Sequence, residues 1–324
     1  MIKILLIRFS SIGDLVLTTA AIRCLKEQMP GCEIHLLVKP QYKEVLAANP
    51  HIGFIHQYGE NFEGTLIELR AQQFDYIIDF QNNFRSNRVI KKLGKPSYKV
   101  HKHNIQKWMI VNFKMRKMQI PHFALRCIQT LKPLGIVDDG KGLDYVYNTP
   151  TLPPNMLPGT AYCCIVMGGT HFTKRLPNSK LVELIEKIDL PVVLLGGKKE
   201  TDDAKWVEQK LYKSIYNSVG MLTLNQSAFL IDKSAVVISN DTGLMHIAAA
   251  LRKPIVSIWG NTTPQMGMTP YYGQENKPQL YSEVQGLSCR PCSKLGRDTC
   301  PKKHFKCMIY HDLDKISQFV KSNS

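Results

Sequence analysis

Apolar runs of strand length alternate with amphipathic segments of helical length along the first half of the chain. Strands are expected at Ile2–Ile7, Ile34–Val38 and Phe74–Phe80. Helices are expected at Leu15–Gln28 and around Tyr42–Ala48, and a basic helical stretch follows the third strand. Strands that alternate with helices are typical of βαβ units, so the pattern predicts an α/β fold with a parallel sheet.

A proline-rich segment interrupts this alternation between Tyr147 and Gly159. Because proline fixes its own backbone and lacks an N–H donor, such a segment does not hold regular structure. We therefore predict an interdomain linker and two α/β domains, residues 1–155 and 156–324. Two such domains are expected to face each other across a ligand-binding cleft. The alternation then resumes, with strands expected at Tyr162–Met167, Val192–Leu195, Ala235–Ser239 and Ile255–Trp259.

The chain has 324 residues, of which 44% are hydrophobic and 21% are charged. These are ordinary values for a soluble globular protein of about two domains. No apolar run approaches the ~20 residues that a membrane-spanning helix needs. The N-terminal run Met1–Arg8 is too short for a signal peptide and lacks a small-residue cleavage site. Together these features predict a cytoplasmic location.

Charge is distributed unevenly: the formal net charge is +16, and no Asp or Glu occurs between Phe80 and Val137. A field of one sign attracts an anionic partner such as phosphorylated lipid, a membrane surface or nucleic acid. A solvated basic face is the plainer interpretation, but interleaved apolar residues favour the partner. The thirteen basic residues of this stretch are Arg85, Arg88, Lys91, Lys92, Lys95, Lys99, Lys102, Lys107, Lys114, Arg116, Lys117, Arg126 and Lys132. The apolar residues are Trp108, Met109, Ile110, Val111 and Phe113.

Candidate chemistry lies in the loops that follow the expected strands, and the first is Ser10-Ser11-Ile12-Gly13-Asp14. Gly13 permits backbone conformations that other residues avoid, and Asp14 comes at the start of a helix. Asp14 is either a helix cap, a position where Asp is favoured, or a general base on a cleft-facing loop. The loop lacks the Gly-x-Gly-x-x-Gly pattern of dinucleotide-binding folds, which argues against a nicotinamide enzyme.

Three loops in the second half suit a nucleoside diphosphate. In Gly168–Pro177, Thr170 and backbone amides can donate hydrogen bonds to phosphate, and Lys174 adds a positive charge. The segment Asp241–His246 opens an Ala-rich helix, whose free amides and dipole favour an anion. A Gly-Gly turn precedes Glu200, whose carboxylate can hold a ribose diol. For each loop, the alternative is an ordinary surface turn or a capped helix without a ligand.

These motifs together resemble glycosyltransferase family 9, which contains the ADP-heptose:lipopolysaccharide heptosyltransferases. The residues that carry the resemblance are Ser10–Asp14, Lys174 and the block Asp241-Thr242-Gly243-Leu244-Met245-His246-Ile247-Ala248-Ala249-Ala250. The resemblance runs from Met1 to at least Pro270. It implies a GT-B fold with two Rossmann-like domains, of which 1–155 binds the acceptor and 156–324 binds the nucleotide sugar. It also implies an inverting transfer that requires no cofactor.

The same resemblance implies roles for individual residues. Asp14 matches the family's proposed catalytic base, and Lys174 is expected to stabilise the leaving diphosphate. The implied donor-binding residues are Thr170, Lys174, Glu200, Leu222, Asp241, Thr242, Gly243 and His246. The implied acceptor-binding residues are Ser10, Ser11, Gly13, Arg85 and Arg88. The loop departs from the family at Asn82-Asn83, where Gly is often found. The basic stretch would meet an anionic, lipid-linked acceptor at the inner membrane face, and we expect a monomer without a nucleic-acid partner.

The nine cysteines fall into two groups. Five are scattered in apolar surroundings and are predicted to be reduced and buried: Cys24, Cys32, Cys127, Cys163 and Cys164. The other four lie in a Cys-rich segment, residues 289–307, which also contains His304: Cys289, Cys292, Cys300 and Cys307. In a cytosolic protein this pattern favours a structural zinc over disulfides. Free thiols or a redox pair remain alternatives, because the second pair lacks Cys-x-x-Cys spacing.

Other functions remain open from the sequence. A transferase that uses another nucleotide sugar, or an epimerase of similar fold, fits the same loops. A nucleic-acid-binding protein would fit the charge, but the basic stretch contains no recognisable nucleic-acid module. A catalytically inactive relative is disfavoured, because Asp14, Lys174 and Asp241 are all present.

Overall fold

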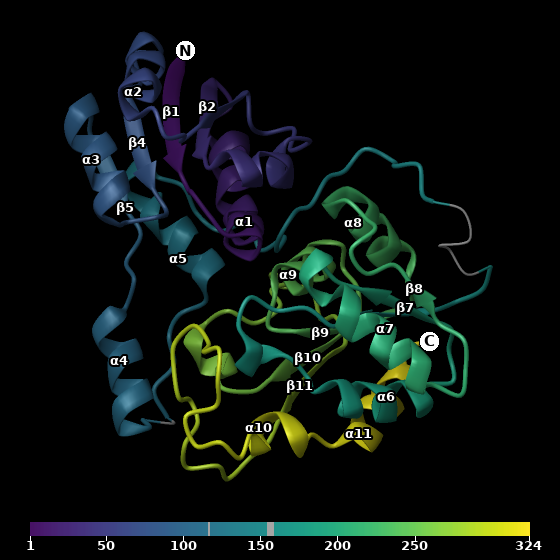
Figure 1. The fold of residues 1–324 in the computed structure, drawn as a ribbon. Helices are drawn as coiled ribbons and strands as arrows, with labels where there is room; N and C mark the ends of the chain where they lie inside the picture. The colour runs from purple at the N-terminus through teal and green to yellow at the C-terminus, as the bar shows by residue number, and fades with distance from the viewer. Residues whose placement is uncertain (116, 154–158) are drawn as a thin grey trace. The chain divides into compact units, whose positions relative to one another are not determined.

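The computed structural model describes residues 1–115, 117–153 and 159–324. The chain divides into two compact units (Figure 1). The first unit comprises residues 1–103, 121–147 and 273–275, and the second comprises 104–120, 148–272 and 276–324. The predicted boundary at 155 lies outside the described residues. Residues 104–120, predicted in the first domain, belong to the second unit.

The first unit is built on a five-stranded sheet in the order β3-β2-β1-β4-β5, in which all the paired strands are parallel. Its strands are β1 (Ile2–Ile7), β2 (Cys32–Val38), β3 (Phe54–Gln57), β4 (Tyr76–Asp79) and β5 (Ser97–Lys99). Both faces of the central strands are covered, which explains why these strands are continuous apolar runs rather than alternating ones.

Helices cover both faces of this first sheet. On one face, α1 packs against α5, and the short helices η1 and η2 continue the layer. On the other face, α2 and α3 close a core that contains Leu5, Ile7, Leu69 and Val89. The bounds are α1 (Ile12–Gln28), η1 (Pro40–Leu46), α2 (Phe62–Ala71), α3 (Phe84–Leu93), α5 (Phe123–Thr130) and η2 (Lys132–Leu134).

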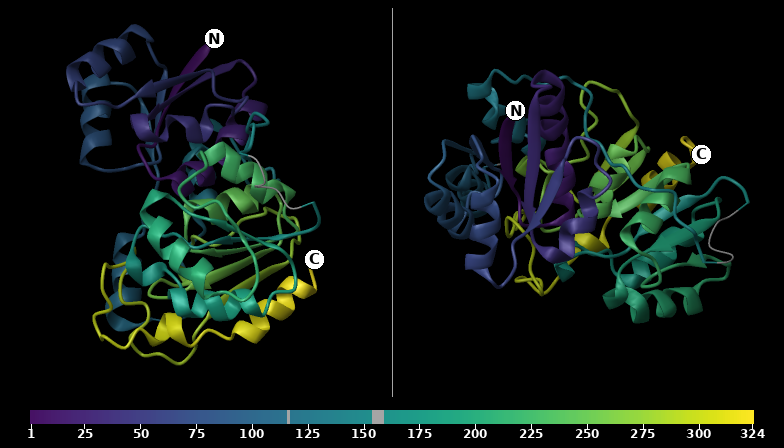
Figure 2. Two further views of the ribbon diagram at one scale, coloured as in Figure 1. Left: turned by 45° about the vertical axis from the view of Figure 1, so that its right-hand side comes forward. Right: turned by 90° about the horizontal axis from the view of Figure 1, so that it is seen from above.

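The second unit has a six-stranded sheet in the order β11-β10-β9-β6-β7-β8, and its paired strands are also parallel. Its strands are β6 (Cys163–Val166), β7 (Val192–Leu195), β8 (Tyr216–Asn217), β9 (Val236–Asn240), β10 (Ile255–Trp259) and β11 (Gln279–Glu283). Figure 2 shows the helices of this unit on both sides of its sheet, with α6 and α11 on one face and α8 and α9 on the other.

The helices of the second unit are α4 (Asn104–Phe113), α6 (Asn178–Glu186), α7 (Thr201–Lys210), α8 (Leu224–Lys233), α9 (Gly243–Ala250), α10 (Lys306–Ile309) and α11 (Leu313–Lys321). Three one-turn helices complete it: η3 (Phe172–Lys174), η4 (Lys198–Glu200) and η5 (Pro264–Met266). Helix α4 belongs here because Ile110 and Ile120 pack against Met266, and the N–H of Ile120 donates to the carbonyl of Gln265 at 2.9 Å.

Both sheets reverse their strand order at one point, between β1 and β4 in the first unit and between β6 and β9 in the second. In open parallel sheets a ligand site forms outside the carboxyl ends of the strands at such a switch point. The loops after these four strands carry most of the predicted site residues, whereas Glu200 follows β7 and Leu222 follows β8. The α/β class and the two parallel sheets predicted from the sequence are therefore confirmed.

Several element bounds differ from those predicted. β1, β7 and β10 occupy the predicted residues, whereas the segment around Tyr42–Ala48 forms the short helix η1 rather than an α-helix. The four edge strands were not predicted, because β3, β5, β8 and β11 are short or partly exposed and lack a long apolar run. Within the described residues, no helix has the length and apolar character needed to cross a bilayer.

Candidate active site

The loops after β1 and β4 meet at the switch point of the first sheet. Nη1 of Arg8 donates a hydrogen bond to the carbonyl of Phe80 at 2.6 Å. The N–H of Phe9 donates to Oε1 of Gln81 at 3.0 Å. These two bonds tie together segments that are far apart in the sequence, and they place the side chain of Arg8, only 8% exposed, beside the start of α1.

Asp14 lies in the first turn of α1, where its carboxylate is held from two sides. Oδ2 accepts hydrogen bonds from the N–H of Ser11 at 3.1 Å and from Oγ of Ser11 at 3.0 Å. Nη2 of Arg8 forms an ion pair with the same oxygen at 2.8 Å. Asp14 therefore does cap the helix, but a helix cap does not require the ion pair with Arg8.

The charge state of Asp14 follows from a balance of opposing effects. Burial by itself would raise the pKa of this carboxyl, but the Arg8 guanidinium and the hydrogen bonds from Ser11 outweigh burial and lower the pKa below its usual value. The side chain keeps 23% of its surface exposed. Asp14 is thus an ionised carboxylate at neutral pH that a ligand can still reach.

The other predicted acceptor residues surround this loop in different ways. The carbonyl of Ser10 accepts a hydrogen bond from Nε of Arg8 at 2.8 Å, and Gly13 is buried in the first turn of α1. Arg85 is exposed near the start of α3. Arg88 is also exposed, but its guanidinium lies 3.9 Å from the centroid of the Phe62 ring. The structure thus leaves Arg85 more open to an incoming anion than Arg88.

Asp79 shapes the start of this α3 loop. It is completely buried at the end of β4, and its carboxylate accepts hydrogen bonds from the N–H groups of Gln81 and Asn82 and from Oγ of Ser86. Burial raises its pKa despite these three bonds. Asp79 therefore acts as an internal cap that fixes the loop, and its role there is structural.

Sequence reasoning missed Arg8 and Arg126. Arg126 is 3% exposed on α5, and its guanidinium, like that of Arg8, lies 5.0 Å from the centroid of the Phe123 ring. Nη2 of Arg126 is buried and makes no hydrogen bond within the described residues. Burial and the neighbouring Arg8 lower its pKa. A charge directly after the apolar run Ile2–Ile7 was a signal for Arg8, whereas Arg126 was one of thirteen basic residues with nothing to distinguish it.

Lys174 and Asp241 come together at the switch point of the second sheet. Nζ of Lys174 forms an ion pair with Oδ2 of Asp241 at 2.6 Å, and the two side chains are 15% and 11% exposed. Oγ1 of Thr262, on the loop after β10, donates to the same carboxylate oxygen at 3.0 Å. Three strand-end loops thus converge on Asp241, and Lys174 keeps an open side toward solvent.

Asn240 holds the Lys174 loop against β9. Its side-chain amide is buried and donates to the carbonyls of Met167 and Gly168 at 3.0 and 3.1 Å. Its Oδ1 accepts from the N–H of Leu176 at 3.3 Å. Because both ends of the loop are bonded to one side chain, the position of Lys174 is fixed relative to the start of α9. Asn240 is a further residue that sequence reasoning missed.

The start of α9 carries the rest of the predicted donor block. Thr242 is the residue that precedes the helix, and its hydroxyl lies 3.2 Å from that of Ser239. Gly243 opens the helix, and His246 is 2% exposed within it. The N–H groups of this first turn have no partner in the helix itself, so the geometry suits an anion.

Glu200 and Arg175 form a second ion pair nearby. Nη2 of Arg175 lies 2.9 Å from Oε1 of Glu200, and Oε2 of Glu200 accepts from the N–H of Gly197 at 2.9 Å. Glu200 is 6% exposed, so this carboxylate is engaged with protein groups. Of the other two predicted donor residues, Thr170 is exposed and Leu222 is half-buried between β8 and α8.

The Cys-rich segment packs directly on the Lys174 loop. Thr173 and Arg297 exchange three hydrogen bonds of 2.8 to 3.0 Å, in which the Thr173 hydroxyl both donates and accepts. The rings of Phe172 and Phe305 stack with centroids 5.2 Å apart. A Cβ on Gly296 would approach the side chain of His171 within 2.5 Å. Only glycine fits at that position, and it lets the two backbones approach closely.

The same segment also braces the loop after β10. The guanidinium of Arg290 donates to the carbonyls of Trp259, Gly260 and Thr262, and it pairs with Glu283 at 3.1 Å. The N–H of Cys292 donates to the carbonyl of Asn261 at 3.1 Å. The two loops that present Lys174 and Thr262 to Asp241 therefore rest on one segment.

The four thiols of this segment lie close enough to affect one another. Burial raises the pKa of Cys292, and the neighbouring Cys289 and Cys300 raise it further. Burial and the nearby thiols raise the pKa of Cys307 to about 12. Sγ of Cys289 is 3.8 Å from Nε2 of His304. Across the described ranges, however, no three of these residues bring their ligand atoms within 4.8 Å of one another.

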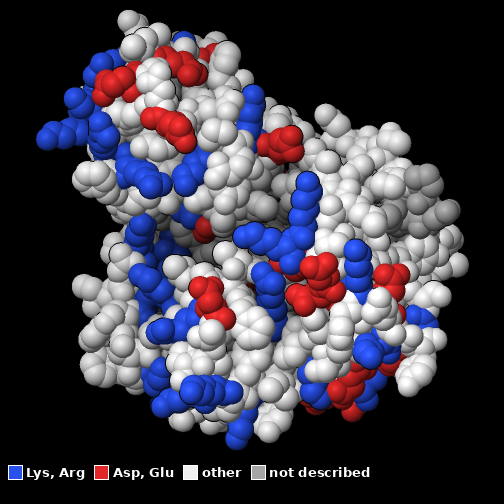
Figure 3. All heavy atoms as spheres, in the orientation of Figure 1, with Lys and Arg blue, Asp and Glu red and all other residues white. Residues whose placement is uncertain are grey.

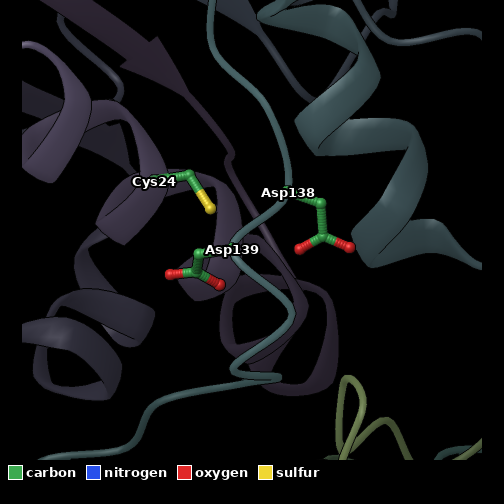
Figure 4. Close-up of side chains that lie close together, drawn as sticks. All are labelled: Cys24, Asp138 and Asp139. Carbon is green, nitrogen blue, oxygen red and sulfur yellow. The ribbon is translucent and has the colours of Figure 1, made fainter.

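Among the described residues, one group of three possible metal ligands does have its ligand atoms within 4.8 Å of one another, and it lies in the first unit. It consists of Cys24, Asp138 and Asp139 (Figure 4). Asp139 already receives two hydrogen bonds from the buried Arg23, at 2.7 and 2.9 Å, and its pKa is about 2 despite partial burial. Burial raises the pKa of Cys24 to about 11. We interpret the group as part of a structural ion-pair network, which also includes an ion pair between Arg23 and Asp144.

The chain is similar to known proteins over most of its length. Residues 66–296, more than half of the chain, match the family model described as glycosyltransferase family 9 (heptosyltransferase). The lipooligosaccharide heptosyltransferase 2 of Haemophilus influenzae is 25% identical over 300 residues, which cover 81% of this chain and 84% of that protein.

Two solved Escherichia coli structures are similar over almost the whole chain. ADP-heptose lps heptosyltransferase II has a TM-score of 0.70 at 19% identity and covers 99% of this chain and 98% of its own. Heptosyltransferase WaaC with ADP has a TM-score of 0.68 at 19% identity and covers 100% of both chains. At this identity the likeness concerns the fold, and it confirms the GT-B class expected from the sequence.

Proposed function

Because the chain belongs to glycosyltransferase family 9, we propose that it moves a heptose from ADP-heptose to a saccharide of the lipopolysaccharide core, with inversion at the transferred carbon. The observation that carries the proposal is the Lys174–Asp241 pair at the switch point of the second unit, and an ionised, reachable Asp14 at the switch point of the first unit supplies a base. The relatives' names, and ADP in one of the similar structures, support the choice of donor.

The proposed chemistry assigns one step to each switch point. Asp14 removes the proton from an acceptor hydroxyl as that oxygen attacks the anomeric carbon of the sugar. The bond from that carbon to the nucleoside diphosphate breaks, and negative charge grows on the leaving phosphates. Lys174 and the N–H groups at the start of α9 stabilise this charge, which supplies without a metal the electrostatic help that the leaving group needs.

The other candidate residues are proposed to bind either the donor or the acceptor. Thr170, Thr242 and Gly243 contact the diphosphate, His246 supports that helix turn, and Glu200 and Leu222 contact the nucleoside. For Glu200 to bind a ribose diol, its pair with Arg175 must be shared or opened. Ser10, Ser11, Gly13 and Arg85 line the acceptor side.

Arg126 is an addition to the acceptor side. Its buried Nη2 makes no hydrogen bond within the described residues, and a buried unbonded donor is costly. We propose that a phosphate or carboxylate of the acceptor receives this donor. An anionic, lipid-linked acceptor would also bring the enzyme, acting as a monomer, into peripheral contact with the membrane.

A zinc ion in the Cys-rich segment remains part of the proposal. Cys289, Cys292, Cys300 and Cys307 would hold it, because thiolates suit zinc and the four cysteines lie in one short segment. Its contribution would be to stiffen the brace on the donor loops. The test is elemental analysis of the purified protein, with the Cys300→Ser variant compared: stoichiometric zinc that the variant loses supports the site, and none in either protein refutes it.

The first experiment measures thermal stability with ADP, UDP, GDP, CMP, NAD and ADP-heptose, and with generic DNA. We expect the midpoint to rise with ADP and to rise further with ADP-heptose, because ligands of the native state stabilise it. A shift only with another nucleotide would retain the transferase and discard heptose. A shift only with generic DNA would favour a nucleic-acid-binding protein instead.

The second experiment separates the base from the helix cap at Asp14. Asp14→Asn keeps an oxygen that can accept from Ser11 but removes the base, so we expect transfer to fall by ~10²–10⁴-fold with unchanged affinity for ADP. Thr223→Ala, which removes the N-cap of α8, serves as the matched loss of a cap and should leave transfer intact. Near-normal transfer by Asp14→Asn would exclude Asp14 as the base.

A further inference from the structure

Helix α4 presents an apolar face to solvent. Ile105, Trp108 and Phe113 are 75%, 55% and 65% exposed. Ile105 and Trp108 are three residues apart and are therefore neighbours on the helix surface, and the rings of Trp108 and Phe113 meet edge to face with centroids 5.3 Å apart. Single exposed apolar residues are common on proteins, but three large ones gathered on two turns form a patch.

The opposite side of α4 fixes the helix to the second unit. Ile110 is fully buried and packs with Ile120 and Met266. At the end of the helix, Nζ of Lys114 donates to the carbonyls of Val111 and Pro291 at 2.6 and 2.7 Å. The apolar stretch interpreted as one feature in the sequence therefore divides into two parts, one that anchors the helix and one that is exposed.

The charge around this patch is predominantly positive. No acidic residue occurs between Phe80 and Val137, whereas Lys107, Lys114 and Lys117 lie on or next to α4. The adjoining Cys-rich segment, which Pro291 links to α4, has one acidic residue, Asp298, and six basic ones: Arg290, Lys294, Arg297, Lys302, Lys303 and Lys306. All of these basic residues except Arg290 are exposed.

Figure 3 shows the consequence on the molecular surface. Lys and Arg predominate over the lower left, where Figure 1 draws α4 and the Cys-rich segment, and uncharged surface lies among them. An apolar helix face surrounded by cations is the arrangement that binds the interface of a bilayer with anionic lipids. The phosphate backbone of a nucleic acid would not bury the aliphatic side chain of Ile105. A protein partner would not need all the surrounding charges to be positive.

We propose that α4 docks the second unit on an anionic phospholipid surface. Ile105, Trp108 and Phe113 enter the boundary between headgroups and acyl chains, and the lysines and arginines around them meet lipid phosphates. The proposal rests on the lipid-linked acceptor of the proposed function, and it assigns membrane contact to the donor-binding unit rather than to Arg85 and Arg88 of the first.

The test measures binding to vesicles rich in phosphatidylglycerol and to vesicles of phosphatidylcholine. The triple variant Ile105→Ser, Trp108→Ser, Phe113→Ser is compared with a control in which Ile67→Ser and Trp206→Ser replace exposed residues on α2 and α7. Both control helices carry acidic residues, and the two side chains are 68% and 41% exposed. We expect the α4 variant to lose binding to the anionic vesicles by on the order of 10-fold and the control to keep it.

Tryptophan fluorescence tests the same contact between α4 and the vesicle, and it does not require a variant that binds vesicles more weakly. The chain has three tryptophans, and Trp259 is fully buried. Vesicles should shift the tryptophan emission to shorter wavelength. Trp108→Phe should abolish the shift, and Trp206→Phe should leave it unchanged.

The outcomes also separate this proposal from the proposed function. Equal vesicle binding by both multiple variants overturns the docking surface. A change of mass in light scattering for the α4 variant alone, with vesicle binding unchanged, would make the face a contact between two copies and equally overturns it. Transfer to a water-soluble acceptor and the response to ADP should persist in the α4 variant. The wild-type protein could show neither transfer nor a response to ADP and still bind vesicles through α4. In that case the proposed function is wrong and the docking surface is retained.

Discussion

The two switch points of the molecule each hold an acid–base ion pair, but they hold it by different means. In the first unit, Arg8 and Asp14 belong to one strand–turn–helix, and every group that bonds Asp14 comes from this local segment. In the second unit, Lys174 and Asp241 come from two loops that Asn240, Thr262 and the Cys-rich segment hold together. The groups that bond the proposed base thus come from its own segment, with Arg8 itself anchored on the carbonyl of Phe80, whereas the proposed cation for the leaving group is held by contacts between segments far apart in the chain.

Removal of Lys174 should have the largest effect on this comparison. Lys174→Met takes away the cation that we propose stabilises the leaving diphosphate, so we expect kcat/KM to fall by ~10²–10³-fold, the usual cost of one such group, and the affinity for ADP to weaken. Steady-state kinetics and ADP titration measure both. Lys180→Met, which opens the exposed pair of Lys180 with Glu183, is the matched control. Equal kinetics for the two variants would remove Lys174 from the mechanism.

Removal of Arg8 should change the pH dependence rather than the donor site. Without Arg8, burial would dominate and the pKa of Asp14 would rise, by ~1–3 units for the loss of an adjacent opposite charge. Because the base acts only when ionised, the acidic limb of the kcat/KM profile should move to higher pH in Arg8→Met. Activity near pH 5 should fall by about 10-fold and that near pH 8 much less. Arg8→Lys should restore the limb, and an unmoved limb in Arg8→Met would contradict the assignment.

Breaking the brace on the Lys174 loop should have a smaller effect. Thr173→Val removes a hydroxyl that bonds the backbone of Arg297 in both directions, so the loop loses its register on the Cys-rich segment. We expect the Kd for ADP to rise several-fold, on the order of 1 kcal/mol, while the pH profile of transfer stays unchanged. Thr130→Val removes a hydroxyl that is also buried, one that donates to Arg126 within α5, and should leave the Kd as it is.

The contrast between local and distant contacts also explains which parts of the molecule the sequence could predict. The strands β1, β7 and β10 are continuous apolar runs, and these runs alone located them in the sequence. Asp14 became a candidate because a strand, a Ser-Gly turn and a helix follow one another directly in the chain. The exposed edge strands have no such run. They form because a neighbouring strand offers free N–H and C=O groups, as β10 does for β11.

Tertiary positions were harder still. Arg126 is an ordinary basic residue in its segment, and only the fold buries its guanidinium beside Phe123 and Arg8. Asn240 and Thr173 are common loop residues whose bonds reach segments far along the chain. The division of α4 into an anchoring face and an exposed face likewise needed Met266, which no periodicity within the helix reveals.

The smallest expected effect concerns the stability of the base-bearing unit and leaves the donor-bearing unit untouched. Arg23 holds the pKa of Asp139 at about 2, below its unfolded value, so the pair stabilises the fold above about pH 4 and the stabilisation is lost as pH falls toward the folded pKa. Asp139→Asn should lower the free energy of unfolding by about 2 kcal/mol at pH 6. The difference from the wild type should shrink to nothing near pH 2, with the affinity for ADP unchanged at neutral pH. Urea unfolding at a series of pH values measures the free energy of unfolding. Asp314→Asn is the control, because it opens an exposed pair with Lys187 and should lower that free energy much less. A deficit that did not depend on pH would mean that packing rather than charge explains the buried Arg23.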